Sequence, residues 1–269
     1  MIRIAGHFGE LMQGTMGPDG PVALVTLPCP VLGVAARHIS GIGFDLDATS
    51  QALVSADKAQ ALLKRLDLSL TGRIELRAEM PLGGGAGAST AALVALAKLA
   101  GYRGTPRRLA AACIAIEGAS DPVMFSQPHH QLWASRCGQK LADLPQLPRF
   151  EVIGGFYGDP LRTDATDTRF PDIAARVPQW IAAAQAGDLP ALARLASQSA
   201  ARTLDLRGPR PDPTADLARQ LGALGYVIAH TGSARGLIFA PGMVPLDWRS
   251  VLERAGLRDT LRFTAGGPE

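Results

Sequence analysis

A glycine-rich segment in the first half of the chain has the composition of a phosphate-binding turn. Four glycines occupy the seven positions from Leu82 to Ala88, and two hydroxyl residues, Ser89 and Thr90, follow them. Glycines let successive backbone N–H groups point into one turn, and the N-terminus of a following helix adds partial positive charge. The segment therefore predicts an anion site, where either hydroxyl could bind Mg²⁺ or donate to a phosphate oxygen. The alternative is a glycine turn needed only for packing.

Two common nucleotide-binding motifs do not account for this segment. A Walker A loop requires a lysine before its final hydroxyl residue, and no lysine lies in or beside the segment. A dinucleotide-binding turn opens the first strand–helix–strand unit and has an acid about 20 residues later. This segment lies mid-chain instead, and the next acid is the distant Glu117. The charge of a bound phosphate must then be neutralised by Mg²⁺, by the helix N-terminus or by an arginine.

The segment resembles the phosphate loop of the GHMP small-molecule kinase superfamily. That loop has the form Pro-x3-Gly-(Leu/Met)-x-Ser-Ser-(Ala/Thr), follows a strand and opens a helix. The chain fits this form in register from its proline, with an alanine in the apolar position, an alanine in place of the first serine and a serine at the second. The resemblance implies that ATP binds at Pro81, Gly83, Gly84, Gly85, Ala86, Gly87, Ala88, Ser89 and Thr90.

Three further segments resemble one branch of that superfamily, the L-threonine kinases associated with cobalamin synthesis and propanediol utilisation. Residues 6–14 (Gly-His-Phe-Gly-Glu-Leu-Met-Gln-Gly) are similar to the branch's Gly-x-x-Gly-Glu-Leu-x-Gln-Gly. Residues 116–125 (Ile-Glu-Gly-Ala-Ser-Asp-Pro-Val-Met-Phe) are similar to Ile-Glu-Pro-Thr-Asp-Ser-x-x-Phe, with one residue inserted between the acids. Residues 229–237 (Ala-His-Thr-Gly-Ser-Ala-Arg-Gly-Leu) are similar to Ala-His-Ser-Gly-Thr-x-x-Gly-Leu. All four segments follow the family order.

The resemblance implies an α+β GHMP kinase fold with two subdomains. Residues 1–145 would be like the second domain of ribosomal protein S5 and carry the phosphate loop, and residues 146–269 would be ferredoxin-like. It also implies a kinase that uses ATP and Mg²⁺ to convert L-threonine to O-phospho-L-threonine for cobalamin side-chain synthesis. Two alternatives stay open: a kinase for another hydroxyl metabolite, or a binding protein that has lost catalysis. The second is suggested by departures at Ala88, at Ala92 and before Asp121.

Two acids are candidates for the chemistry of phosphoryl transfer, which needs bound phosphates, Mg²⁺ and an acceptor hydroxyl aimed in line. Glu117, together with Ser89, is the candidate metal ligand because Mg²⁺ prefers oxygen ligands. The alternative for Glu117 is a solvated carboxylate at a helix end. Asp121 is the candidate base or orienter of the acceptor hydroxyl. Its alternative is a turn-forming aspartate before Pro122.

Candidates for binding the acceptor lie near both ends of the chain. Glu10 and Gln13 are expected in a glycine-flanked turn, where the carboxylate could receive the ammonium of threonine and the amide could bond its carboxylate. The alternative is a β-turn with a surface acid. His7 stands where the branch has a small residue. The resemblance also implies substrate contacts from a small-residue turn formed by His230, Thr231, Gly232 and Ser233.

The elements around these residues follow from hydropathy patterns. Residues 71–80 alternate between apolar and charged side chains, which predicts a strand that ends at the loop. Residues 91–100 predict a helix directly after the glycines, and a second helix should run from Pro106 to Ile116 with Thr105 as its N-cap. Residues 1–48 predict short strands and turns, 51–66 a helix, and 118–150 an irregular region.

The second half of the chain alternates irregularly between strands and helices, which favours the α+β class. We find no internal repeat in it. Strands are predicted at 150–156, 226–230, 236–239 and 259–264, and helices near 172–186, 189–204, 213–224 and 246–256.

Composition excludes several classes of protein. The chain of 269 residues is 47% hydrophobic, which fills a sizeable core and excludes a disordered protein. Its three separated cysteines give neither a disulfide framework nor a zinc site. No apolar run could span a membrane, and no signal peptide is evident, so we expect a cytoplasmic protein. Scattered arginines and a net charge of +3 do not suggest nucleic acid. The expected partner is a small molecule, and the oligomeric state stays open.

Overall fold

Two long antiparallel strands form the centre of the fold. The computed structural model describes residues 1–47, 53–161, 164–209 and 211–267. Strand β1 (Ile2–Thr15) pairs with β2 (Val22–Ile39), so the prediction of short strands in this region is wrong. The register shifts between Ala5 and Gly6 and again between His7 and Met12. These bulges let the strands bend and continue past two prolines that would otherwise end them.

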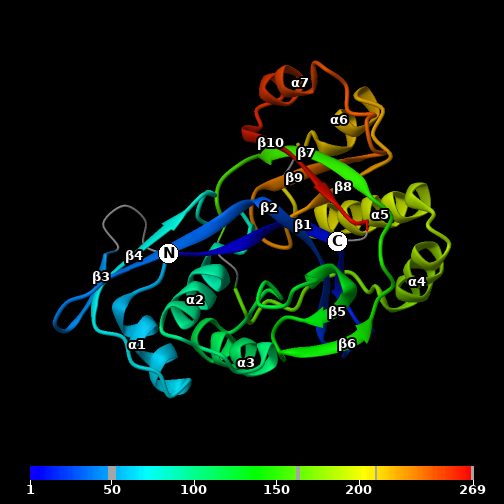
Figure 1. Ribbon diagram of the computed structural model, residues 1–269. Coiled ribbons are helices and arrows are strands. Elements are labelled where there is room, and N and C mark those ends of the chain that lie inside the picture. The colour runs from blue at the N-terminus through cyan, green and yellow to red at the C-terminus, as the bar shows by residue number, and fades with distance from the viewer. Residues whose placement is uncertain (48–52, 162–163, 210, 268–269) are drawn as a thin grey trace.

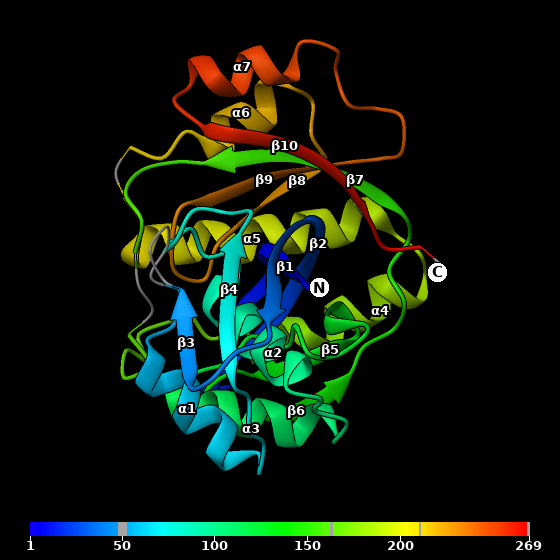
Figure 2. The same ribbon diagram turned by 60° about the vertical axis from the view of Figure 1, so that its left-hand side comes forward.

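Strands from both halves of the chain extend this pair into one curved sheet (Figure 1). One residue pair, Glu10 with Ile228, joins β1 to β8 and thereby connects the two groups of strands. Strands β3 and β4 run parallel to each other (Figure 2). The order across the sheet is β10 (Arg258–Ala265), β7 (Phe150–Phe156), β9 (Ala234–Phe239), β8 (Gly225–Ile228), β1, β2, β4 (Gly72–Ala78) and β3 (Phe44–Asp47).

A hairpin occupies the region that the sequence predicts to be irregular. Strands β5 (Gln131–Ala134) and β6 (Gln139–Asp143) follow a short 3₁₀ helix, η1 (Pro128–His130), and β5 also pairs with β2. The prediction is wrong because both strands are only four or five residues long and the prolines flank them rather than interrupt them. The hairpin carries the chain from α3 back beside β2.

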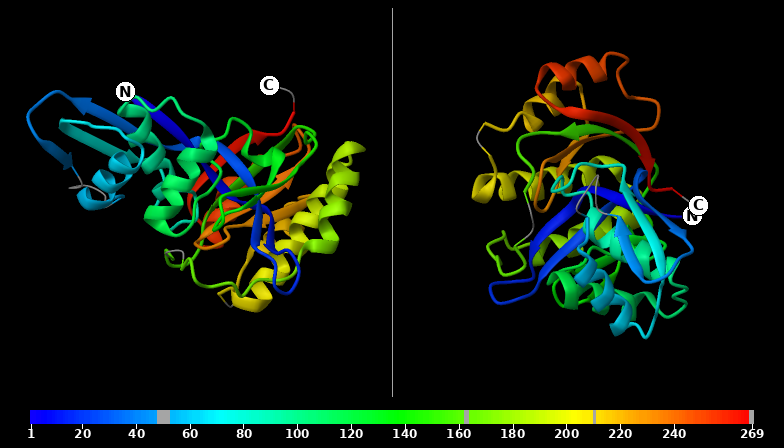
Figure 3. Two further views of the ribbon diagram at one scale, coloured as in Figure 1. Left: turned by 90° about the horizontal axis from the view of Figure 1, so that it is seen from below. Right: turned by 90° about the vertical axis from the view of Figure 1, so that its left-hand side faces the viewer.

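Helices cover both sides of the sheet. Helix α5 (Leu189–Arg207) packs against β1 and β8 and lies beside α4 (Val177–Gln185), which follows the short 3₁₀ helix η2 (Ala174–Arg176) (Figure 3). Short helices α6 (Thr214–Gln220) and α7 (Trp248–Arg254) cover the opposite face of the C-terminal strands (Figure 1). The first half adds α1 (Ala56–Arg65), α2 (Ala88–Leu99) and α3 (Pro106–Glu117).

The elements around the glycine segment match their predictions. Strand β4 alternates buried and exposed residues as its pattern predicts. The side chain of Thr105 accepts a hydrogen bond from the backbone of Arg108 and caps α3 as expected. Helix α2 is almost entirely buried against β1 and β2, so the loop before it is held on a fixed base. Within the described ranges, no helix is both long and apolar enough to cross a membrane.

Candidate active site

The glycine segment forms a turn between β4 and α2 whose backbone only glycine adopts without strain. Gly83, Gly85 and Gly87 have φ angles of 71°, 73° and 75°, in the left-handed region. A Cβ atom on Gly85 would lie 2.1 Å from the carbonyl oxygen of Thr231. Gly87 is the N-cap of α2 and has no side chain to cap the helix. The first backbone N–H groups of α2 are thereby available to an anion.

A cavity of about 800 Å³ opens beside this turn. Every residue from Pro81 to Thr90 lines it, which includes all the predicted ATP contacts. Five other predicted site residues line the same cavity: Glu10, Glu117, Asp121, His230 and Thr231. The remaining three, Gln13, Gly232 and Ser233, are not among the described residues that line it. The chain therefore brings most of the predicted site together across distant segments.

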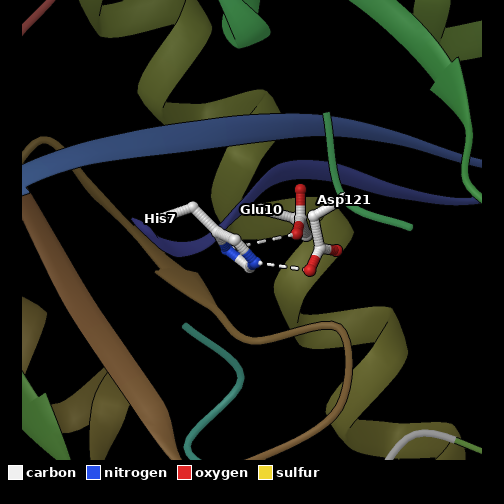
Figure 4. Close-up of side chains that lie close together, drawn as sticks. All are labelled: His7, Glu10 and Asp121. Atoms are coloured by element: carbon white, nitrogen blue, oxygen red, sulfur yellow. Dashed lines mark ion pairs between the residues drawn. The ribbon is translucent and has the colours of Figure 1, made fainter. Parts of the chain in front are cut away.

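A histidine lies between two carboxyl groups at one end of the cavity (Figure 4). His7 Nε2 is 3.3 Å from Asp121 Oδ2, and His7 Nδ1 is 3.7 Å from Glu10 Oε1. The side chains of His7 and Glu10 are 4% and 0% exposed, whereas that of Asp121 is 28% exposed. The backbone N–H of His7 also donates to the carbonyl of Ala86 at 3.1 Å, which connects this group to the glycine segment. The sequence predicts no role for His7. The one signal that points to it is that His7 stands where the threonine kinase branch has a small residue.

Burial and mutual charge set the protonation of this group. Burial raises the pKa of Glu10 to about 8, although His7 partly opposes the shift. Burial disfavours the charged form of His7, but Asp121 and Glu10 overcome it and raise the pKa of His7 to about 9. Burial likewise acts to raise the pKa of Asp121, but His7 holds that pKa below its ordinary value. At neutral pH the group therefore contains an ionised Asp121, a protonated His7 and a neutral Glu10.

The arrangement fits an imidazolium better than a metal ligand. Donor atoms of His7, Glu10 and Asp121 lie within 4.8 Å of one another. Each ring nitrogen of His7 faces a different carboxyl group, whereas a metal would take the lone pair of one nitrogen. The oxygen donors suited to Mg²⁺ lie elsewhere on the cavity wall, at Ser89 in the first turn of α2 and at Glu117 at the end of α3.

A lysine reaches the cavity from α1. Lys58 lines the cavity and its Nζ atom lies 2.8 Å from Glu117 Oε1. The sequence names only Mg²⁺, a helix N-terminus or an arginine as sources of positive charge for a phosphate, and Lys58 is a further candidate on the cavity wall. Helix α1 packs against α3, and this long-range contact brings a remote lysine to the site. No local sequence signal marks it.

The chain resembles solved kinase structures over nearly its whole length, although no protein-family model and no curated protein matches its sequence. Against L. major mevalonate kinase in complex with R-mevalonate, the TM-score is 0.66 at 15% identity, with 98% of this chain and 96% of that chain covered. Against homoserine kinase from Cytophaga hutchinsonii, the TM-score is 0.63 at 17% identity, with 99% of this chain and 94% of that chain covered. Against 4-(cytidine 5'-diphospho)-2C-methyl-D-erythritol kinase it is 0.61 at 22% identity, covering 99% and 100%. The chain has the GHMP kinase fold.

The predicted fold class is thereby confirmed. Kinases named for three different acceptors share the GHMP kinase fold with this chain. The fold alone therefore leaves the acceptor open. The L-threonine branch rests on the resemblance of the motifs.

Within the GHMP kinase fold of this chain, Gln13 supports the site from behind. It lies with Glu10 on β1 rather than in the expected turn, because the bulges keep this segment within the strand. The side chain of Gln13 donates to the carbonyl of Ile228 at 3.3 Å and accepts from His230 Nδ1 at 3.2 Å. Both ends of its amide are engaged.

The turn from His230 to Ser233 packs against the glycine segment. The backbone N–H groups of Ser233 and Ala234 both donate to the carbonyl of Gly84, at 3.0 and 2.9 Å. A Cβ atom on Gly232 would lie 2.5 Å from the backbone nitrogen of Gly85. The two small-residue turns therefore pack backbone against backbone, and the second fixes the shape of the first.

Proposed function

We propose that this protein is an ATP-dependent kinase that transfers the γ-phosphoryl group to a hydroxyl group of a small molecule. The observation that carries the proposal is a single cavity with a glycine phosphate loop on its wall and an ionised Asp121 at one end, in a chain with the GHMP kinase fold. Phosphoryl transfer depends on positioning and charge stabilisation more than on covalent chemistry. The glycine segment would position and stabilise the phosphates, and Asp121 would position the acceptor, in one cavity.

The loop end of the cavity would hold the nucleotide. The N–H groups of the glycine turn and of the first turn of α2 would bind phosphate oxygens, and Lys58 would add a mobile positive charge. Ser89 and Glu117 would hold Mg²⁺, which neutralises phosphate charge when it is bound. Because Glu117 is paired with Lys58, the two side chains would exchange partners when Mg-ATP enters.

Asp121 would orient the acceptor hydroxyl and receive its proton. Its side chain is the most exposed of the three titratable side chains His7, Glu10 and Asp121, so a hydroxyl can reach it from the cavity. The protonated ring of His7 keeps Asp121 ionised, as a base requires. His7 thus acts through Asp121 and is a positioning residue.

We propose L-threonine as the acceptor and O-phospho-L-threonine as the product, used in cobalamin side-chain synthesis. The resemblance of residues 6–14, 116–125 and 229–237 to the threonine kinase branch supports this choice. The position of Glu10 on the cavity wall also supports it, because its carboxyl group would give up its proton to solvent and pair with an ammonium. Such a kinase would work in the cytoplasm on a small molecule, with no membrane or nucleic acid involved. Residues 1–145 and 146–269 would form its two subdomains.

A coupled assay of ADP release tests the proposal. Purified protein is given Mg-ATP with L-threonine, L-serine, L-homoserine or mevalonate, and L-threonine is expected to give the highest kcat/KM. ADP release with another acceptor, but not with L-threonine, would support the kinase activity and replace L-threonine as the proposed substrate. Binding of Mg-ATP without ADP release from any acceptor would instead favour a protein that has lost catalysis, as the departures at Ala88 and Ala92 allow.

A further inference from the structure

An arginine that the sequence did not single out lines the same cavity as the proposed base. The backbone N–H of Ser120 donates to the carbonyl of Ser135 at 2.9 Å. This bond brings the segment that carries Arg136 beside the segment that carries Asp121, and both residues line the cavity. Arg136 follows β5, the strand that the sequence does not reveal, which explains why the pattern gave no hint of it.

The guanidinium of Arg136 is only partly satisfied by the protein. Its Nη2 atom donates to the backbone carbonyls of Asp167 and Asp164, at 2.6 and 3.4 Å. Its Nε and Nη1 atoms are buried and have no hydrogen-bond partner among the described residues. The carboxylate of Asp167 is taken by Arg207, at 2.9 Å. An anion on Arg136 would supply the missing acceptors and the missing charge.

The surroundings of Arg136 favour an anionic ligand. Arg136 and Arg207 both lie over the ring of Phe170, with Cζ atoms 5.6 and 4.2 Å from its centroid. His230 stacks on the same ring at 4.0 Å. Burial, together with the two arginines, lowers the pKa of His230 to about 3, so this ring stays neutral. Two arginines therefore gather at this part of the wall, where the Asp167 carboxylate pairs with Arg207 and Arg136 has no salt-bridge partner among the described residues.

Glu10 offers a carboxyl group in the same cavity, and it would carry the opposite charge once an entering ammonium displaces its proton to solvent. It is fully buried, and neither of its carboxyl oxygens has a hydrogen-bond partner within the described ranges. Asp121 lies in contact with the His7 that also faces Glu10, and it lies next to the segment that carries Arg136. An unsatisfied acid and an unsatisfied arginine thus accompany the base that would receive the hydroxyl.

We propose that Arg136 binds the carboxylate of the acceptor while Glu10 receives its ammonium, so that the cavity selects a zwitterionic hydroxy amino acid. The inference rests on the proposed function and deepens it. It also reassigns the carboxylate contact, because the amide of Gln13, to which the sequence gave this role, is engaged at both ends. Arg136 is then a specificity-determining residue for the acceptor.

The test compares L-threonine with L-threonine amide, which keeps the hydroxyl and the ammonium but lacks the carboxylate. With the wild-type protein we expect kcat/KM for L-threonine to exceed that for the amide by roughly 100-fold, as for a lost charge-assisted hydrogen bond. Arg136→Gln should lose most of this preference: kcat/KM for L-threonine falls by roughly 100-fold, mainly through KM, while the amide changes by less than about 3-fold. The KM for ATP should stay unchanged.

Two further variants complete the test. Arg103→Gln, at an exposed arginine that does not line the cavity, should retain the wild-type preference. Arg136→Lys keeps the charge and should show an intermediate preference, which also covers the case in which Arg136→Gln does not fold. Equal use of L-threonine and its amide by the wild-type protein would overturn the role of Arg136 and leave the kinase intact. Absence of ADP release with every acceptor would overturn the proposed function itself.

Discussion

The part of the cavity proposed for the nucleotide (the nucleotide end) and the part proposed for the acceptor (the acceptor end) are built in different ways. The nucleotide end is one continuous segment, residues 81–90, whose function depends on backbone conformation. The acceptor end is assembled from side chains of separate segments: from β1, from the loop after α3 and from Arg136, two residues after β5. A change of shape should therefore damage the first end, and a change of charge should damage the second.

This difference decides where substitutions act. At the nucleotide end, positive φ angles and close backbone contacts leave no room for a Cβ atom. At the acceptor end, the side chains fit with room for ligand, but their charges are balanced against burial. The four predictions below test this contrast, beginning with the largest expected effect.

Replacing the base tests the acceptor end without a change of shape. Asp121→Asn should lower kcat by about 10³-fold, within the range for loss of a general base, because the amide cannot accept the proton. The dissociation constant for ATP should change little, since the phosphate loop is untouched. Asp19→Asn, at an exposed aspartate, serves as the control and should keep full activity. An active Asp121→Asn would move the role of base to another residue.

Adding one methyl group to the loop tests the nucleotide end without a change of charge. Gly85→Ala should raise the KM for ATP by roughly 100-fold, because its Cβ would displace the backbone of Thr231 and misplace the phosphate groups. Gly187→Ala is the matched control: Gly187 also has a positive φ, of 65°, but nothing lies within 4 Å of its added Cβ. Both substitutions carry the strain of about 1–2 kcal/mol for a left-handed alanine. Equal KM values for the two would show that the loop tolerates the added methyl group and that the contact with Thr231 does not fix its shape.

The same contrast explains what the sequence could predict. The loop, β4 and the cap of α3 are determined by neighbouring residues, and their patterns predicted them correctly. The hairpin β5–β6 and the placement of Lys58 depend on contacts between distant segments, and no local pattern carries that information. The glycines on either side of Glu10 and Gln13 predict a turn, whereas pairing with β2 holds this segment in a bulged strand. The positions of Glu10 and Asp121 beside one loop came from the family resemblance and not from periodicity.

Lys58 is an exception to the contrast between shape and charge, because it lies at the nucleotide end but would act through its charge. Lys58→Ala should raise the KM for Mg-ATP by about 10-fold, because one partly exposed charge near the phosphates is lost. Lys64→Ala, on an exposed site of the same helix, should leave this KM unchanged. The measurement is the KM for ATP at saturating and at limiting Mg²⁺. An unchanged KM for ATP in Lys58→Ala would mean that Lys58 pairs with Glu117 and does not contact the phosphates.

The smallest effect concerns stability and isolates the buried charges at the acceptor end. In the folded protein the pKa of Glu10 is about 8, well above its ordinary value of 4.5, so the folded state binds this proton more tightly than the unfolded state does. Stability from Glu10 is therefore complete below pH 4.5 and is lost as the pH rises toward 8. His7 acts with the same sign, with its contribution lost between pH 6.5 and about 9.

The window between pH 5 and 6.5 separates the two groups, because His7 is protonated there in both the folded and the unfolded states. In this window the Tm of the wild-type protein should fall by roughly 3–5 °C per pH unit on account of Glu10. Glu10→Gln, which keeps the shape but cannot ionise, should remove most of that slope, and Glu253→Gln at an exposed glutamate should keep it. Thermal unfolding followed by circular dichroism measures the slope. The same slope in Glu10→Gln would mean that Glu10 is ionised in the folded protein. The ammonium of the acceptor would then bind Glu10 without displacing a proton from it.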